Sequence, residues 1–196
     1  DSANRGLNFS SPHETLFKII LNSDTVLTPK WLSKFEACFK SDSYIGLACP
    51  TSNNAENISL PIPEGWSWLD MAEALEQLAP VNHYPDISTA IGFCMGIRSS
   101  LIDSVGLFDR IFAPGYAEDS DLHFRVLAHG FRSVLIKDCF VYHESHASFS
   151  ENKARLVARN RPIFDQRWST IYRNDLAHHD KTNPLSEPRE CIKQAL

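Results

Sequence analysis

The sequence lacks a surplus of basic residues. Its 196 residues include 19 Lys and Arg against 24 Asp and Glu, which gives a formal net charge of −5. Proteins that bind nucleic acid neutralise phosphates with clustered Lys and Arg, so we expect no nucleic-acid partner. The sequence also lacks any apolar run near the ~20 residues that a membrane-spanning helix requires. A hydrophobic content of 43% instead favours one globular domain with its own core.

Cysteine pairs at metal-binding spacing are missing as well. The five cysteines are scattered, their number is odd, and none forms a C-x-x-C pair. They are Cys38, Cys49, Cys94, Cys139 and Cys191. This pattern argues against a cysteine zinc site, and it predicts reduced, mostly buried thiols in a cytoplasmic protein.

The chain alternates apolar runs typical of strands with stretches typical of amphipathic helices, which predicts an α/β architecture. Strands are predicted at 16–21, 44–49, 89–97, 133–136 and 140–143. Helices are predicted from the N-cap Thr28 to about 40, from the N-cap Ser67 to about 78, and at 99–105, 120–128 and 151–172. Pro50 and Pro80 are interpreted as stops, and the polar residues after 174 are expected to be loosely held.

Three polar clusters adjoin these elements. They are "NSD" at 22–24, "EDSD" at 118–121 and "HESH" at 143–146. Each alone has an ordinary explanation: a turn, carboxylates that offset a helix dipole, and surface histidines. Ligands of open α/β sheets, however, collect at the carboxyl ends of the strands. We therefore predict that Asp24, Asp119 and His143 share one cleft.

Four segments of the sequence together resemble one enzyme family. They are "ILNSDT", "TPKWL", "GFCMGIRSSLIDSVGLFD" and "GYAEDSDLHFRVLAHGFRSVLIKDCFVYHESHAS". In this order they resemble family 2 glycosyltransferases, which are inverting, nucleotide-sugar-dependent enzymes with the GT-A fold. The resemblance runs from about 4 to 174 and implies a GT-A-like, Rossmann-related mixed sheet flanked by helices. Within the family it looks closest to bacterial enzymes that build lipopolysaccharide, O-antigen or other surface polysaccharide.

The resemblance implies a divalent-metal site near Asp24. Asp24 corresponds to the last acid of the family's D-x-D motif, which binds Mn²⁺ or Mg²⁺ on the donor diphosphate. Asn22 stands where many members have the first Asp, so this chain reads N-x-D, with Ser23 between. His143 corresponds to a histidine that adds a metal ligand in some members, and His146 is a second candidate. Carboxylate oxygen suits either cation, whereas an imidazole ligand favours Mn²⁺.

The same resemblance implies a general base at the start of the acidic helix. Asp119 corresponds to that base, and Glu118 lies beside it. The acceptor hydroxyl is a weak nucleophile, so a carboxylate must take its proton as the new bond forms. One direct displacement with one base inverts the anomeric centre. The implied substrates are a nucleotide-diphosphate sugar donor and a glycan or lipid-linked glycan acceptor, with Trp66, Trp68 and Tyr84 expected to stack on sugar rings.

The front of the chain departs from the family. Members begin with strands that hold the nucleoside, and no counterpart precedes Asn4; the chain itself begins at Asp1. The resemblance therefore implies a partial GT-A domain over 1–174 that lacks the first nucleotide-binding strands, followed by a polar tail over 175–196. Peripheral association with the inner face of a membrane would then come from the rest of a longer parent protein.

Two other functions remain compatible with these residues. A fragment without the nucleoside pocket could bind glycan or a partner protein without turnover. A metal-dependent phosphohydrolase that uses Asp24, Asp119 and His143 would need a second carboxylate cluster spaced for two metals, which the sequence does not show cleanly. Metal-dependent binding of nucleotide diphosphates separates the transferase from the binding module.

Overall fold

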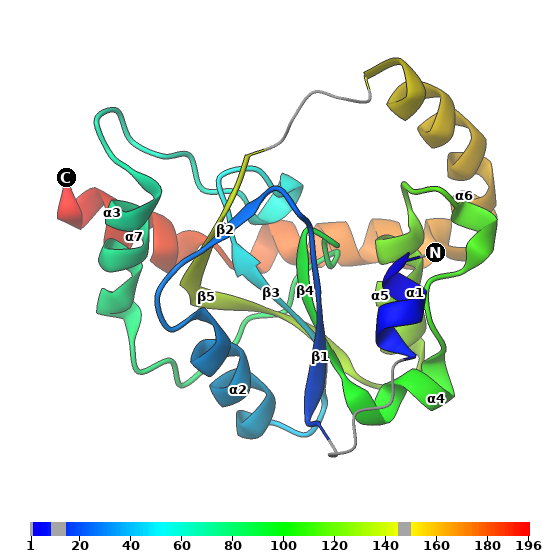
Figure 1. Ribbon diagram of the computed structural model, residues 1–196, viewed down its shortest axis with the longest axis horizontal. Helices are drawn as coiled ribbons and strands as arrows, with labels where there is room; N and C mark the ends of the chain where they lie inside the picture. The colour runs from blue at the N-terminus through cyan, green and yellow to red at the C-terminus, as the bar shows by residue number, and fades with distance from the viewer. Residues whose placement is uncertain (1, 9–14, 145–149) are drawn as a thin grey trace.

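The computed structural model describes residues 2–8, 15–144 and 150–196. These residues form a five-stranded sheet with the strand order β1-β4-β3-β5-β2 (Figure 1). The strands are β1 (Phe17–Leu21), β2 (Thr25–Leu27), β3 (Ile45–Thr51), β4 (Cys94–Arg98) and β5 (Arg132–His143). The β3–β5 pair is parallel, and the β1–β4, β3–β4 and β2–β5 pairs are antiparallel. The prediction of a mixed α/β sheet is confirmed.

Helices flank this sheet. They are α1 (Ser2–Leu7), α2 (Trp31–Ser41), α3 (Trp68–Leu75), α4 (Ile102–Val105), α5 (Glu118–Ala128), α6 (Ser150–Thr182) and α7 (Ser186–Ala195). α2 packs closely on β4, because a Cβ atom at Gly96 would lie only 2.8 Å from the ring of Phe35. In Figure 1, α6 descends beside α5 and then runs behind the sheet toward α7, with Pro162 inside it. None of the described helices combines the length and apolar character needed to cross a bilayer.

Two apolar clusters stabilise the molecule. The larger one joins the sheet to α2, α3 and α7, and the smaller one consists of Phe112, Phe124 and Phe164 with Trp168 and Tyr172 packed on it. The smaller cluster therefore joins α5 to α6. All five cysteines are buried and free, as predicted.

Two strands extend beyond their predicted ends. β3 continues through Pro50 to Thr51, although Pro50 was interpreted as a stop. β4 pairs with β3 only as far as Ala48, so at Pro50 the strand has one paired neighbour, and a proline is tolerated there as it is at an edge. The predicted strands at 133–136 and 140–143 are one strand, β5, whose register with β3 shifts between them.

The start of α2 also differs from the prediction. Thr28 does not cap this helix; its hydroxyl donates to the backbone oxygen of Phe140, 2.5 Å away. α2 begins at Trp31, after Lys30 in a left-handed conformation (φ 62°). The predicted cap of α3 is confirmed, because Ser67 accepts from backbone N–H groups of the first turn and Asp70 bonds the backbone of Ser67 in return.

The C-terminal residues are not loosely held, which corrects the prediction. α6 extends to Thr182 and α7 follows it. α7 packs on α3, and Leu185 and Ile192 belong to the larger apolar cluster. The thiol of Cys191 donates to the backbone oxygen of Ala74 at 3.0 Å. The polar residues of α7 are mostly exposed, whereas Pro188, Cys191 and Ile192 are buried.

Candidate active site

The turn that carries Asp24 connects β1 to β2 and is fixed at both ends. The backbone N–H of Asn22 donates to the oxygen of Phe93 at 2.8 Å, and the hydroxyl of Thr25 donates to the oxygen of Asn22 at 2.8 Å. The N–H of Glu144 donates to the backbone oxygen of Asp24 at 2.9 Å. Asp24 is therefore held between the segment that precedes β4 and the end of β5.

His143 lies against Asp24 because β2 pairs with β5 in a register that sets Thr25 opposite His143. The imidazole Nε2 is 3.4 Å from Oδ1 of Asp24. The imidazole Nδ1 is 2.8 Å from the backbone oxygen of Asn54. The side chain of Asn53 bonds both the N–H and the C=O of His143. Two asparagines thus fix the backbone and the ring of this histidine.

This geometry matches the donor set of a divalent cation. A carbonyl oxygen only accepts, so Nδ1 of His143 carries a proton, and in the neutral ring Nε2 presents its lone pair toward Asp24. A histidine whose second nitrogen is held by a backbone carbonyl is oriented as metal ligands are. Within the described part of the chain, no three His, Cys, Asp or Glu residues gather to hold a metal ion.

The acidic pair lies where a loop enters α5. The two residues before the helix, Tyr116 and Ala117, have left-handed backbones (φ 72° and 81°). Asp119 accepts from the N–H of Gly92 at 3.0 Å through Oδ2 and from the N–H of Ser120 at 2.8 Å through Oδ1. Oδ1 also accepts from the hydroxyl of Ser120 at 3.5 Å, so Asp119 is held rigidly and its free lone pair lies on Oδ2.

Burial changes the acidity of both carboxyl groups. It raises the pKa of Asp119 above its ordinary value. It also raises the pKa of Glu118 to about 7, with a further contribution from the charge of Asp119. The Oε2 atom of Glu118 is buried without a hydrogen-bond partner. A carboxyl group with a pKa near neutrality can exchange a proton at physiological pH, as acid–base catalysis requires.

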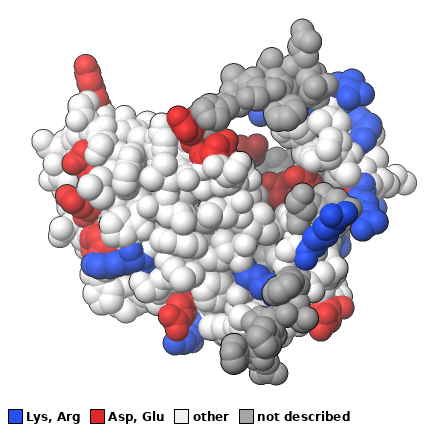
Figure 2. Space-filling view, viewed as in Figure 1, with Lys and Arg blue, Asp and Glu red and all other residues white. Residues whose placement is uncertain are grey.

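One short segment joins the two halves of the site. Gly92 donates to Asp119, and the ring of the next residue, Phe93, stacks on His143 with 5.3 Å between ring centroids. The segment thus contacts the acidic pair on one side and the Asp24–His143 pair on the other. The structure thus links Asp119 to the Asp24–His143 pair through two consecutive residues, Gly92 and Phe93. Figure 2 shows acidic side chains around a hollow on the face in view. His146, the second metal-ligand candidate, lies outside the described residues.

Several residues of the site carried no local signal in the sequence. Asn53, Asn54 and Gly92 act through contacts with residues far along the chain. Burial and then the charge of Asp119 raise the pKa of Glu56, so Glu56 is a third carboxylate that interacts with Asp119.

Asp121, by contrast, has a structural role. Its side chain is fully buried and bonded to Arg125, Arg167 and Trp168. We had interpreted it as a carboxylate that offsets the helix dipole. Its partners instead tie α5 to α6.

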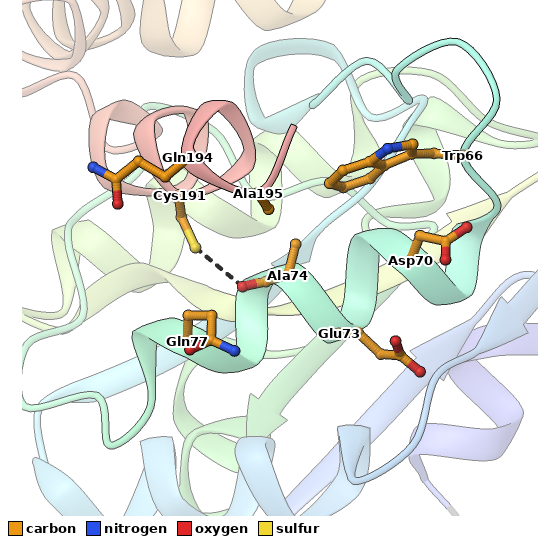
Figure 3. A pocket seen from close by; sticks show the side chains of 8 residues that line it. All are labelled: Trp66, Asp70, Glu73, Ala74, Gln77, Cys191, Gln194 and Ala195. Carbon is orange, nitrogen blue, oxygen red and sulfur yellow. Dashed lines mark hydrogen bonds between the residues drawn. The ribbon is translucent and has the colours of Figure 1, made fainter.

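Two grooves lie on the described part of the chain. A groove of about 760 Å³ runs beside β1 and ends at Asn22 and Ser23. Another, of about 700 Å³, lies between α3 and α7 (Figure 3). Trp66 lines the second groove, whereas Tyr84 is only 7% exposed and has too little free surface to stack on a sugar. None of the residues that line the α3–α7 groove belongs to the Asp24 or Asp119 clusters.

Comparison with known proteins identifies the family. The model of glycosyl transferase family group 2 matches residues 19–168, a range that contains both acidic clusters and both histidines. No curated protein matches the sequence. The match covers more than half of the chain, and the mixed sheet agrees with a GT-A-like domain. The chain therefore belongs to glycosyl transferase family group 2, whose members transfer glycosyl groups.

Proposed function

We propose that this chain carries the metal-binding and acid–base part of an inverting transferase that moves a sugar from a nucleotide diphosphate to a growing glycan. The observation that carries the proposal is the Asp24–His143 contact, which shares the Gly92–Phe93 segment with the acidic pair. The sequence resemblance further favours a glycan of the bacterial cell surface, such as lipopolysaccharide or O-antigen.

Asp24 and Nε2 of His143 would hold Mn²⁺ or Mg²⁺. When bound, such a cation offsets the negative charge that develops on the departing diphosphate. The oxygen of Asp24 suits both ions, and the nitrogen of His143 favours Mn²⁺. The groove beside β1 supports a donor position there, since it ends at Asn22 and Ser23, next to Asp24. Its volume lies in the range of small-molecule sites.

Asp119 would act as the general base. Its carboxylate takes the proton of the acceptor hydroxyl while that oxygen attacks the anomeric carbon and the bond to the diphosphate breaks. The two N–H groups of Gly92 and Ser120 fix its orientation. Glu118, with a pKa of about 7, is partly protonated near neutrality and can donate a hydrogen bond to the acceptor. A single displacement of this kind inverts the anomeric centre.

Calorimetric titration with nucleoside diphosphates, with and without Mn²⁺, tests the proposal. We expect binding that requires the ion and that Asp24→Ala abolishes. His143→Ala should weaken Mn²⁺-supported binding more than Mg²⁺-supported binding, and Asn22→Ala should do less than either because an amide oxygen is a weaker ligand. If nucleotide binding by Asp24→Ala still required Mn²⁺ as in the wild type, Asp24 would have only a structural role in the turn. Glycan binding without any nucleotide binding would instead favour a non-catalytic glycan-binding module.

A further inference from the structure

The loop that leads into the acidic pair lacks the hydrogen bonds of regular structure over much of its length. It follows the 3-10 turn Arg110–Phe112 and ends in the two left-handed residues Tyr116 and Ala117. Left-handed backbones are unfavourable for residues other than glycine and persist where their surroundings hold them. The direction in which Glu118 and Asp119 point therefore depends on what holds this loop.

Asn160 of α6 holds it. The side chain of Asn160 is 1% exposed. Its amide nitrogen lies 3.0 Å from the backbone oxygen of Phe112, 2.9 Å from that of Gly115 and 2.7 Å from that of Tyr116. The two amide hydrogens are thus shared among three carbonyls, of which that of Phe112 also accepts from the N–H of Gly115 at 3.0 Å. Its own Oδ1 accepts from Nε of Arg159 at 2.8 Å.

The same face of α6 also holds the helix that follows the acidic pair. Residues 160, 164, 167 and 168 are spaced so that they share one side of a helix. Phe164 packs with Phe112 and Phe124, and Arg167 and Trp168 bond Oδ1 of the buried Asp121 at 3.0 and 2.9 Å. α6 therefore holds the chain on both sides of Glu118 and Asp119. On the loop side Asn160 bonds the carbonyls of Phe112, Gly115 and Tyr116, and the neighbouring Arg159 bonds those of Ile111 and Ala113.

We propose that Asn160 is a positioning residue for the acidic pair, acting through the backbone of the 112–116 loop. The inference rests on the proposed transferase function. Asparagine suits the position because it donates to carbonyls and carries no charge. An aspartate of the same shape offers no donor to the three carbonyls, an alanine removes the side-chain donor from all three, and a serine keeps one donor.

The test compares Asn160→Asp, Asn160→Ala and Asn160→Ser with two controls. Arg161→Ala changes an exposed neighbour that pairs with Asp165. Ile192→Ala weakens the core under α7, far from this loop in the contacts of the described residues. Three quantities are measured at a temperature where every variant is folded: amide exchange over 113–119, single-turnover sugar transfer, and affinity for a nucleoside diphosphate with Mn²⁺.

We expect exchange over 113–119 to rise at least about 10-fold and transfer to fall about 10–100-fold in Asn160→Asp and Asn160→Ala, since misplaced catalytic groups cost rates of this order. Asn160→Ser should lie between these variants and the wild type, and nucleotide affinity should stay within about three-fold throughout. Both controls should keep wild-type exchange and transfer. Because alanine and serine add no buried charge, they carry the test if Asn160→Asp does not fold.

Unchanged exchange over 113–119 in Asn160→Ala would overturn the inference, and so would faster exchange with unchanged transfer. If Ile192→Ala raised exchange over 113–119 and lowered transfer as much as Asn160→Ala does, Asn160 would be only a stabilising residue, and the inference would be overturned as well. A wild-type chain that neither binds a nucleoside diphosphate with Mn²⁺ nor transfers sugar counts against the proposed function itself. The exchange measurement then still decides whether Asn160 holds the loop.

Discussion

Glu118 illustrates how burial adapts a single residue to acid–base chemistry at the expense of stability. Its pKa rises from 4.5 to about 7, mainly because the carboxyl group is buried. The folded state therefore binds a proton more tightly than the unfolded chain does, and folding loses stability as pH rises from about 4.5 through about 7. The buried Oε2 atom without a partner is consistent with this penalty.

Glu118→Gln removes the charge and should relieve the penalty. We expect the free energy of unfolding of the variant to gain on that of the wild type as pH rises from 4 to 8, by on the order of 1–3 kcal/mol. Urea denaturation at a series of pH values measures the difference. A difference that is the same at pH 4 and pH 8 would show that Glu118 ionises as freely in the folded protein as in the unfolded chain.

At the scale of secondary structure, α2, α3 and α7 show when the local sequence is sufficient to predict a helix and its cap. The Ser67 cap was predictable because both of its bonding partners lie within three residues. Thr28 carries the same type of signal, but its hydroxyl bonds Phe140, which is 112 positions away. α7 was not predicted because it has few apolar residues, and their burial depends on packing against α3, which the local sequence does not indicate.

Substitutions in α7 test whether this last helix is part of the fold. Ile192 is 7% exposed within the larger apolar cluster, whereas Leu196 is 74% exposed. Ile192→Ala should lower the free energy of unfolding by about 2–5 kcal/mol, the usual cost of truncating a buried isoleucine. Leu196→Ala should leave it nearly unchanged. Equal urea midpoints for both variants and the wild type would mean that α7 does not pack on α3 in solution.

At the scale of the whole molecule, the sequence was enough to propose the candidate catalytic and metal-binding residues, but not the residues that hold them. Asp24, Asp119 and His143 were predicted because each follows or opens an element with an apolar pattern, and because the segments that contain them together resemble a known family. Asn53, Asn54, Gly92 and Asn160 were not found, since each acts across long sequence separations. A hydrogen bond to a distant carbonyl leaves no periodic trace in the sequence.

The proposed site joins residues from distant parts of the chain, since Asp24 precedes β2 and Asp119 lies in α5. The division of labour between them is the most informative property to measure. Asp119→Asn keeps the shape of the side chain and removes its basicity, so metal-dependent nucleotide binding at Asp24 should survive. Loss of a general base typically lowers turnover by about 10²–10⁴-fold.

Single-turnover sugar transfer and Mn²⁺-dependent nucleotide affinity, measured side by side in the wild type, Asp119→Asn and Glu118→Gln, decide the matter. We expect Asp119→Asn to lower transfer by about 10²–10⁴-fold while nucleotide affinity stays within about three-fold. Near-normal transfer in Asp119→Asn with collapse in Glu118→Gln would move the base to Glu118. Near-normal transfer in both variants would contradict a catalytic role for the acidic pair.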